Sequence, residues 1–163
     1  MILPQEVIQV VLIGIGATAF MDVWLALLKR FGVQTLNFAL IGRWVGHLGR
    51  GKFTHAAIGQ APAIAGERLL GWLTHYAVGI AFAGLLVGMA GTAWMRSPAF
   101  LPAIALGVCS VAAPLFVMQP AMGAGFAASR TPAPWKNRIR SVANHAVFGL
   151  GLYLSAVIIE VTI

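Results

Sequence analysis

The stretch RLLGWLTHYAVG at residues 68–79 decides the fold, because a related stretch, RIRSVANHAVFG, returns at residues 138–149. In each stretch an arginine is followed at the same intervals by a small residue, a histidine and a glycine. The last three are four residues apart, which places them on one face of a helix. Each histidine lies inside an apolar run, where an ionisable side chain is costly and by default indicates a site. The pattern predicts two equivalent helices that carry His75 and His145.

The composition around these stretches is that of a membrane protein. Hydrophobic residues make up 60% of the chain and charged residues only 9%, whereas soluble domains have about 45–50% and about 25%. The net charge of +7 does not indicate nucleic acid binding, because the basic residues lie between apolar segments and no soluble domain is left to present them. We therefore expect the lipid bilayer as a partner and no nucleic acid.

Four segments reach the length of about 20 apolar residues that a spanning helix needs. They lie approximately at 7–28, 69–93, 100–126 and 142–163. They predict an all-α fold, an integral membrane four-helix bundle that forms a single transmembrane domain over residues 1–163. The loops at 29–68 and 127–141 hold every Lys and Arg except Arg96, which makes these loops cytoplasmic by the positive-inside rule. We expect a multi-pass protein of the bacterial inner membrane with both termini in the periplasm.

The second and fourth spans run in the same direction, and each follows a helix that runs the opposite way. This order predicts two helical hairpins related by an axis along the membrane normal, which is a parallel repeat. The first and third spans show no convincing alignment with each other. Small residues inside the helices favour close packing within the bundle or between the subunits of a homo-oligomer.

The first loop also contains an amphipathic segment at 36–48, with Arg43 and His47 turned away from its apolar face. It predicts a short interfacial helix on the cytoplasmic leaflet or a cap packed under the bundle. Pro134 is well placed as the first residue of the last helix. Pro114 and Pro120 predict kinks in the third span.

Polar residues from all four spans are expected at one depth. From the helical rise, Asp22, His75 and His145 lie roughly 8–11 Å inside the cytoplasmic ends of their helices. The third span brings Met118 and Gln119 to a similar level. A buried carboxylate needs a partner, so we expect a histidine or a bound cation beside Asp22. The sequence predicts a polar pocket at the cytoplasmic end, with Arg43 and Arg138 at its mouth.

The predicted function is the binding of a small ligand, metal or cofactor in this pocket. Two imidazoles and a carboxylate, from Asp22, His75 and His145, suit a transition metal, to which Met118 could add a soft ligand. The two histidines facing each other would also suit haem. Arginines at the membrane surface would suit an anionic lipid or small molecule. The identity of a cofactor stays open between these.

Other functions remain open beside this one. A minimal oligomeric transporter or proton-coupled carrier would depend on titration of Asp22. A purely structural polar contact in a scaffold or partner protein is the third alternative. An enzyme acting on lipid lacks paired Asp residues in a loop, and Ser141 near His145 lacks a nucleophile elbow, so enzymatic activity is left undecided. His47 and His55 are interpreted as solvated loop residues rather than metal ligands.

Several strings resemble a known group of proteins. They are LNFALIGRWVGHLGRGKF at 36–53, GERLLGW and HYAVGIAFA within 66–83, VMQPAMGAGFAASRTPAPW at 117–135 and NHAVFGLGLYL at 144–154. Together they are similar to a family of small bacterial inner-membrane proteins of unknown function. The resemblance covers nearly the whole chain. It implies a four-span membrane protein and supplies no activity, substrate or cofactor.

Overall fold

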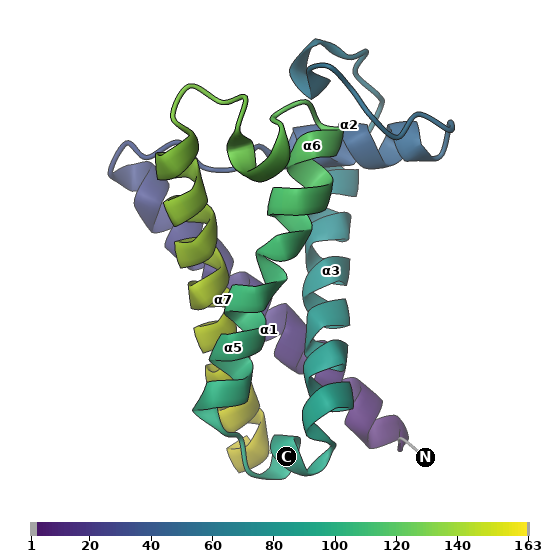
Figure 1. Ribbon diagram of the computed structural model, residues 1–163. Coiled ribbons are helices and arrows are strands. Elements are labelled where there is room, and N and C mark those ends of the chain that lie inside the picture. The colour runs from purple at the N-terminus through teal and green to yellow at the C-terminus, as the bar shows by residue number, and fades with distance from the viewer. Residues whose placement is uncertain (1–2, 163) are drawn as a thin grey trace. The chain divides into compact units, whose positions relative to one another are not determined.

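The computed structural model describes residues 3–162, and this part of the chain is helical without any strand. Figure 1 shows the helices in chain order. The elements are α1 (Pro4–Arg30), α2 (Phe38–Leu48), η1 (Ile58–Gln60), α3 (Glu67–Ala90), α4 (Ala93–Arg96), α5 (Phe100–Ser110), η2 (Pro114–Met118), α6 (Gln119–Ala121), η3 (Phe126–Ala128) and α7 (Pro134–Thr162). The predicted all-α fold is confirmed.

Four helical segments are long and apolar enough to cross a membrane. They are Pro4–Arg30, Glu67–Ala90, Phe100–Ala121 and Pro134–Thr162. Proline begins the first and the last of them, as its fixed φ and missing N–H allow. The third ends before its predicted limit because Gly123 and Gly125 have positive φ, which breaks the helix. The chain is therefore compatible with a multi-pass membrane protein.

The third segment is not a regular helix. α5 ends at Ser110, and a π-helical turn follows at η2, which begins with Pro114. Proline lacks an N–H and its ring crowds the preceding turn, so regular helical bonding cannot continue through it. The irregularity that the sequence predicts at Pro114 is confirmed.

The chain divides into two units, which we describe separately. Unit 1 comprises the residues up to Gln34, Tyr76–Ser110 and the residues from Ala143 onwards; unit 2 comprises Thr35–His75 and Val111–Val142. The division falls within α3 and within α7, so each of these helices contributes residues to both units.

Unit 1 is held together by close helix contacts at glycines. A Cβ added to Gly14 of α1 would lie 2.5 Å from the Cα of Ile80 in α3. A Cβ added to Gly107 of α5 would meet the backbone of Gly149 in α7 in the same way. Small residues let helix backbones approach this closely, which is the usual basis of packing between membrane helices. The core around these contacts consists of the buried side chains Ile13, Ala17, Ala83, Leu86, Val87, Trp94, Met95, Ala103, Leu106, Phe148, Leu152 and Ala156.

The two contacts correspond to each other through the sequence repeat. Gly149 follows the repeat histidine His145 by one turn and contacts α5; Gly79, the equivalent residue of the first stretch, contacts Thr18 and Gly14 of α1. Within α1 and α5 a buried hydroxyl lies one turn beyond the contact glycine, since Thr18 donates to the Gly14 carbonyl at 2.8 Å and Ser110 donates to the Gly107 carbonyl at 2.6 Å. The hydroxyl residues are equivalent in role although their spacing from glycine differs.

Both ends of the described chain border one crevice of unit 1. Its lining includes Leu3 at the start of α1, Thr92 and Arg96 between α3 and α5, and Glu160 near the end of α7. The beginning of α1 and the end of α7 thus lie at the same end of this unit, as an even number of spans requires.

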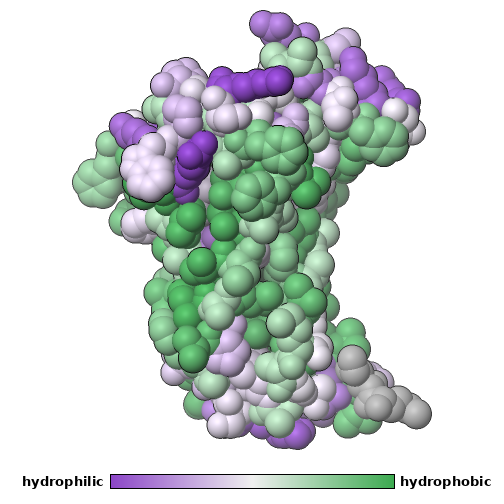
Figure 2. Space-filling view, in the orientation of Figure 1, coloured by the Kyte–Doolittle hydropathy of each residue, from purple (hydrophilic) through white to green (hydrophobic). Residues whose placement is uncertain are grey.

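The spanning helices expose large apolar side chains, as a lipid-facing surface would. Val23, Leu69, Leu101 and Ile158 are each more than half exposed. On the face shown in Figure 2, the spanning helices form broad hydrophobic areas. Such areas are rare on soluble monomers and mark contact with a membrane or a partner.

Unit 2 contains α2 packed on the first turns of α3. Asn37 caps α2 by accepting a hydrogen bond from the N–H of Ala39 at 3.1 Å. A Cβ on Gly42 would meet the Glu67 carbonyl, and one on Gly71 would meet the Phe38 carbonyl. The predicted helix in this loop exists and packs on the start of α3, while its place on the leaflet or under the bundle stays a prediction.

Candidate functional site

The candidate site in unit 1 begins with Asp22, the only aspartate in the chain. It lies in the third quarter of α1 and is partly buried. The hydroxyl of Tyr76 in α3 donates a hydrogen bond to Oδ2 of Asp22 at 2.9 Å. The phenol is a neutral donor, so it orients the carboxylate without neutralising its charge. A carboxylate of this kind inside a spanning helix is a functional-site hypothesis by default.

A second polar contact joins α1 to α7. The indole Nε1 of Trp24 donates to Oδ1 of Asn144 at 3.0 Å. A buried indole N–H needs an acceptor, and the Asn144 amide supplies one. Asn144 directly precedes His145, so this bond also fixes the turn of α7 that carries the histidine.

His145 is held by Ser110 of α5. The Ser110 hydroxyl lies 2.7 Å from Nδ1 of His145 and 2.6 Å from the Gly107 carbonyl oxygen. A carbonyl can only accept, so the single hydroxyl hydrogen goes to Gly107 and the Ser110 oxygen accepts from Nδ1–H of His145. In a neutral imidazole this tautomer has its hydrogen on Nδ1 and its lone pair on Nε2.

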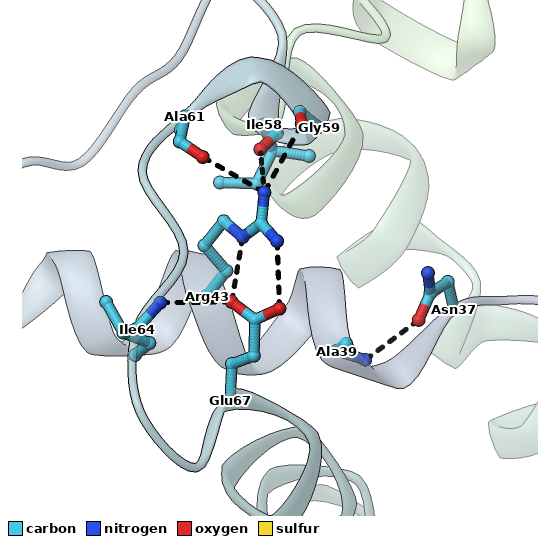
Figure 3. A network of polar contacts seen from close by, with 8 residues as sticks. All are labelled: Asn37, Ala39, Arg43, Ile58, Gly59, Ala61, Ile64 and Glu67. Carbon is cyan, nitrogen blue, oxygen red and sulfur yellow. Dashed lines mark hydrogen bonds and ion pairs between the residues drawn. The ribbon is translucent and has the colours of Figure 1, made fainter.

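Arg43 lies in unit 2 and makes a network of polar contacts there (Figure 3). Its Nε and Nη2 donate to the two carboxylate oxygens of Glu67, each at 2.8 Å. Its Nη1 donates to the carbonyls of Ile58, Gly59 and Ala61 at 3.4, 3.3 and 3.0 Å. The hydrogen bond with Glu67 raises the pKa of Arg43 above its ordinary value. Arg43 therefore joins α2, the loop around η1 and the start of α3. Its predicted place at the mouth of a pocket stays a prediction.

The remaining predicted site residues also lie in unit 2. His75 packs against Phe38, with 4.7 Å between the ring centroids. Nε of Arg138 donates to the Ala127 carbonyl at 2.7 Å. Oε1 of Gln119 is buried and has no hydrogen-bond partner in the described part of the chain. Met118 is the last residue of the π-helical turn.

The predicted layer is thus distributed over both units, with Asp22 and His145 in unit 1 and the others in unit 2. Among residues 3–162, no group of three or more His, Cys, Asp or Glu side chains gathers as a metal site. The metal and haem hypotheses for Asp22, His75, His145 and Met118 stay predictions.

One contact was missed by sequence reasoning. His47 and His55 are buried in unit 2, with exposed fractions of 5% and 8%, and their rings face each other. Their interpretation as solvated loop residues was wrong, because the chain after α2 folds back so that His55 packs beside the last turn of that helix. A spacing of eight residues across a turn of Gly49–Lys52 carries no signal that would reveal this.

All these features define an all-helical protein with four helices able to span a membrane and ionisable residues inside them. The chain belongs to the family described as "Protein of unknown function (DUF2938)", whose model matches residues 11–159. The resemblance to a family of unknown function is confirmed. Comparison with curated proteins and with solved structures gives no match.

Proposed function

We propose that this protein binds a small ligand among the polar side chains of its spanning helices in the bacterial inner membrane. The binding residues in unit 1 are Asp22, Tyr76, Asn144 and His145. The single observation that supports the proposal is the hydrogen bond from Tyr76 to Asp22, because it keeps an ionisable carboxylate oriented inside a span, where such a group is costly.

The chemistry of these residues favours a cationic ligand or one rich in hydrogen-bond donors. The Asp22 carboxylate is an acceptor with a negative charge when ionised, and the His145 imidazole is a nitrogen ligand of the kind that transition metals bind. A metal ion or a small protonated amine meets both requirements. A cofactor whose metal takes an imidazole ligand would use His145 in the same way.

The expected orientation places this site towards the cytoplasmic ends of the helices. It rests on the distribution of Lys and Arg, all of which except Arg96 lie in or at the edges of the first and third connections. Both termini are then periplasmic. The orientation is part of the proposal and has its own test in the Discussion.

The experiment uses the full chain purified in detergent without added metal. Native mass spectrometry and elemental analysis identify any component that stays bound, and absorption spectra detect haem. We expect the component in the wild-type protein and in the control Glu160→Gln, whose acid lies near the end of α7. We expect its loss from Asp22→Asn and His145→Gln. If both variants retain it, or if nothing binds and they lower only the thermal stability, these residues form a structural contact.

A proton-coupled carrier is the second candidate, favoured by the presence of the Asp22 carboxylate within a span. It predicts counterflow of the identified component across proteoliposomes, with loss of counterflow in Asp22→Asn. Binding without counterflow would leave the binding protein as the function.

A further inference from the structure

The buried histidine pair of unit 2 has the geometry of two adjacent ligands. Nδ1 of His47, in the last turn of α2, lies 2.8 Å from Nε2 of His55, in the loop that follows. The ring centroids are 4.9 Å apart and the ring planes differ by 26°. Two imidazole nitrogens bound to one tetrahedral zinc ion at 2.0–2.1 Å would be about 3.3 Å apart. A small separation of the rings would therefore admit an ion between these two nitrogens.

The neutral form of an imidazole is the form that metals bind. A neutral imidazole offers a lone pair on one nitrogen and an N–H on the other. If Nε2 of His55 binds an ion, then Nδ1 of the same ring carries the hydrogen and needs an acceptor.

The structure contains an acceptor that lacks a donor in the same unit. Among residues 3–162, the buried side-chain atoms without a hydrogen-bond partner are Nδ1 of His55 and Oε1 of Gln119. A buried polar atom left unpaired is costly, so each calls for an explanation.

The segments that carry these two atoms are docked on each other. The backbone N–H of His55 donates to the Ala121 carbonyl at 2.8 Å, two residues from Gln119. A Cβ on Gly123 would meet the carbonyls of His55 and Ala56, so glycine is required for this approach. Metal-binding histidines usually donate their second N–H to an oxygen of the protein, and a Gln119 side-chain oxygen supplies that chemistry.

We propose that His47 and His55 bind a divalent transition-metal ion of the zinc type through Nδ1 and Nε2, with Gln119 accepting the hydrogen of His55 Nδ1. Water fills the remaining positions, so the site is open. Imidazole ligands suit zinc, copper, iron and nickel, and the absence of a thiolate from the pair disfavours an iron–sulfur cluster. This site goes beyond the proposed function, because it uses other residues in the other unit.

The test starts from the full chain purified in detergent and stripped with EDTA. Zn²⁺ is titrated by calorimetry, bound metal is counted by elemental analysis after desalting, and Co²⁺ serves as an absorbing substitute. We expect one Zn²⁺ per chain in the wild-type protein. The variants His47→Asn and His55→Gln keep a hydrogen-bonding amide at the contacting position but remove the imidazole, and we expect each to weaken binding at least about 100-fold.

Matched variants keep the result interpretable. Arg50→Gln changes an exposed residue of the turn between the two histidines and should retain Zn²⁺. Gln119→Leu leaves both ligands in place and should weaken binding about 10- to 100-fold, as loss of an orienting partner does. Size-exclusion profiles and melting curves show that the variants are folded. Retention of Zn²⁺ by folded His55→Gln, or no stoichiometric binding by the wild-type chain, would overturn the proposal.

One further outcome separates this site from the one in the spanning helices. If Zn²⁺ is lost from Asp22→Asn and His145→Gln but kept by His47→Asn and His55→Gln, the ion belongs to the proposed function and the histidine pair binds none. If the reverse holds, the histidine pair is the metal site, and the proposed function must be judged on a component other than Zn²⁺.

Discussion

Tyr76 and Asp22 are joined across α3 and α1 by a hydrogen bond of 2.9 Å, although they lie 54 residues apart in the chain. The bond connects the first repeat stretch to the only aspartate, and Tyr76 directly follows the repeat histidine His75. The bond therefore connects the repeated stretch at residues 68–79 directly to the candidate site.

Tyr76→Phe should lower the free energy of unfolding by about 0.6 kcal/mol, and at most about 1.7 kcal/mol, as hydrogen bonds between membrane helices do. Thermal unfolding in detergent measures the change. Tyr153→Phe is the matched control, because the Tyr153 ring packs against Phe100 and should keep this contact as phenylalanine. Equal melting temperatures for Tyr76→Phe and the wild-type protein would show that the bond is not stabilising.

Gly14→Ala and Gly107→Ala should each destabilise the protein by about 1–3 kcal/mol, because a new Cβ would press on the backbone of a neighbouring helix. Gly88→Ala in α3 is the control, since a Cβ there would have no atom within 4 Å. The control should be neutral or slightly stabilising, as alanine favours a helix over glycine. Similar melting temperatures for all three variants would contradict the close packing.

Arg43→Lys should lower the thermal stability of the protein although it keeps the positive charge. Lysine is a point donor and cannot bind both oxygens of Glu67 while also reaching three carbonyls. Arg68→Lys, at the exposed neighbour of Glu67, is the control and should melt like the wild-type protein. A double-mutant cycle with Glu67→Gln should show coupling, and additive effects would mean that the ion pair contributes nothing.

The contribution of His55 to the stability should fall as the pH decreases below about 6.5. The folded protein lowers the pKa of His55, whose ordinary value is about 6.5, so the unfolded chain binds more protons in the interval between the folded and unfolded values. The contribution of His55 is fully present above pH 6.5 and is lost as the pH falls towards its folded pKa. Melting temperatures of the metal-free protein should show a smaller pH dependence in His55→Gln. An unchanged dependence would assign the effect to other groups.

A reporter enzyme that is active only in the periplasm should be active when fused after the C-terminus. The prediction follows from the concentration of Lys and Arg in the connections that we assign to the cytoplasm. A fusion in the loop after α2 should be inactive and serves as the internal control. The opposite pair of results would reverse the orientation and place Asp22 towards the periplasmic ends.

The helical fold was accessible to sequence reasoning because its causes are local. Apolar length marks the four spans, Pro134 marks the start of α7, and Pro114 marks the irregular turn of the third span. The limits of the spans were less accurate, since the end of the third depends on positive φ at Gly123 rather than on hydropathy.

The candidate site was predictable only in part. Burial of ionisable residues identified Asp22 and His145, but their partners Tyr76 and Ser110 depend on helix rotation, which hydropathy does not report. The correspondence of α1 with α5 was invisible because it consists of a glycine and a hydroxyl at unequal spacing. The position of His55 was missed because it depends on how a loop folds back on α2.

The contact between Gly107 and Gly149 fixes the rotation of α7 about its own axis. It fixes which side of the helix faces α5, and His145 lies one turn away, so the histidine meets Ser110 as a result of that setting. Adding one residue between His145 and Gly149 would turn the imidazole by about 100° relative to the contact. An addition after Gly149 would leave it in place. The spacing between His145 and Gly149 therefore determines where the imidazole lies in the site.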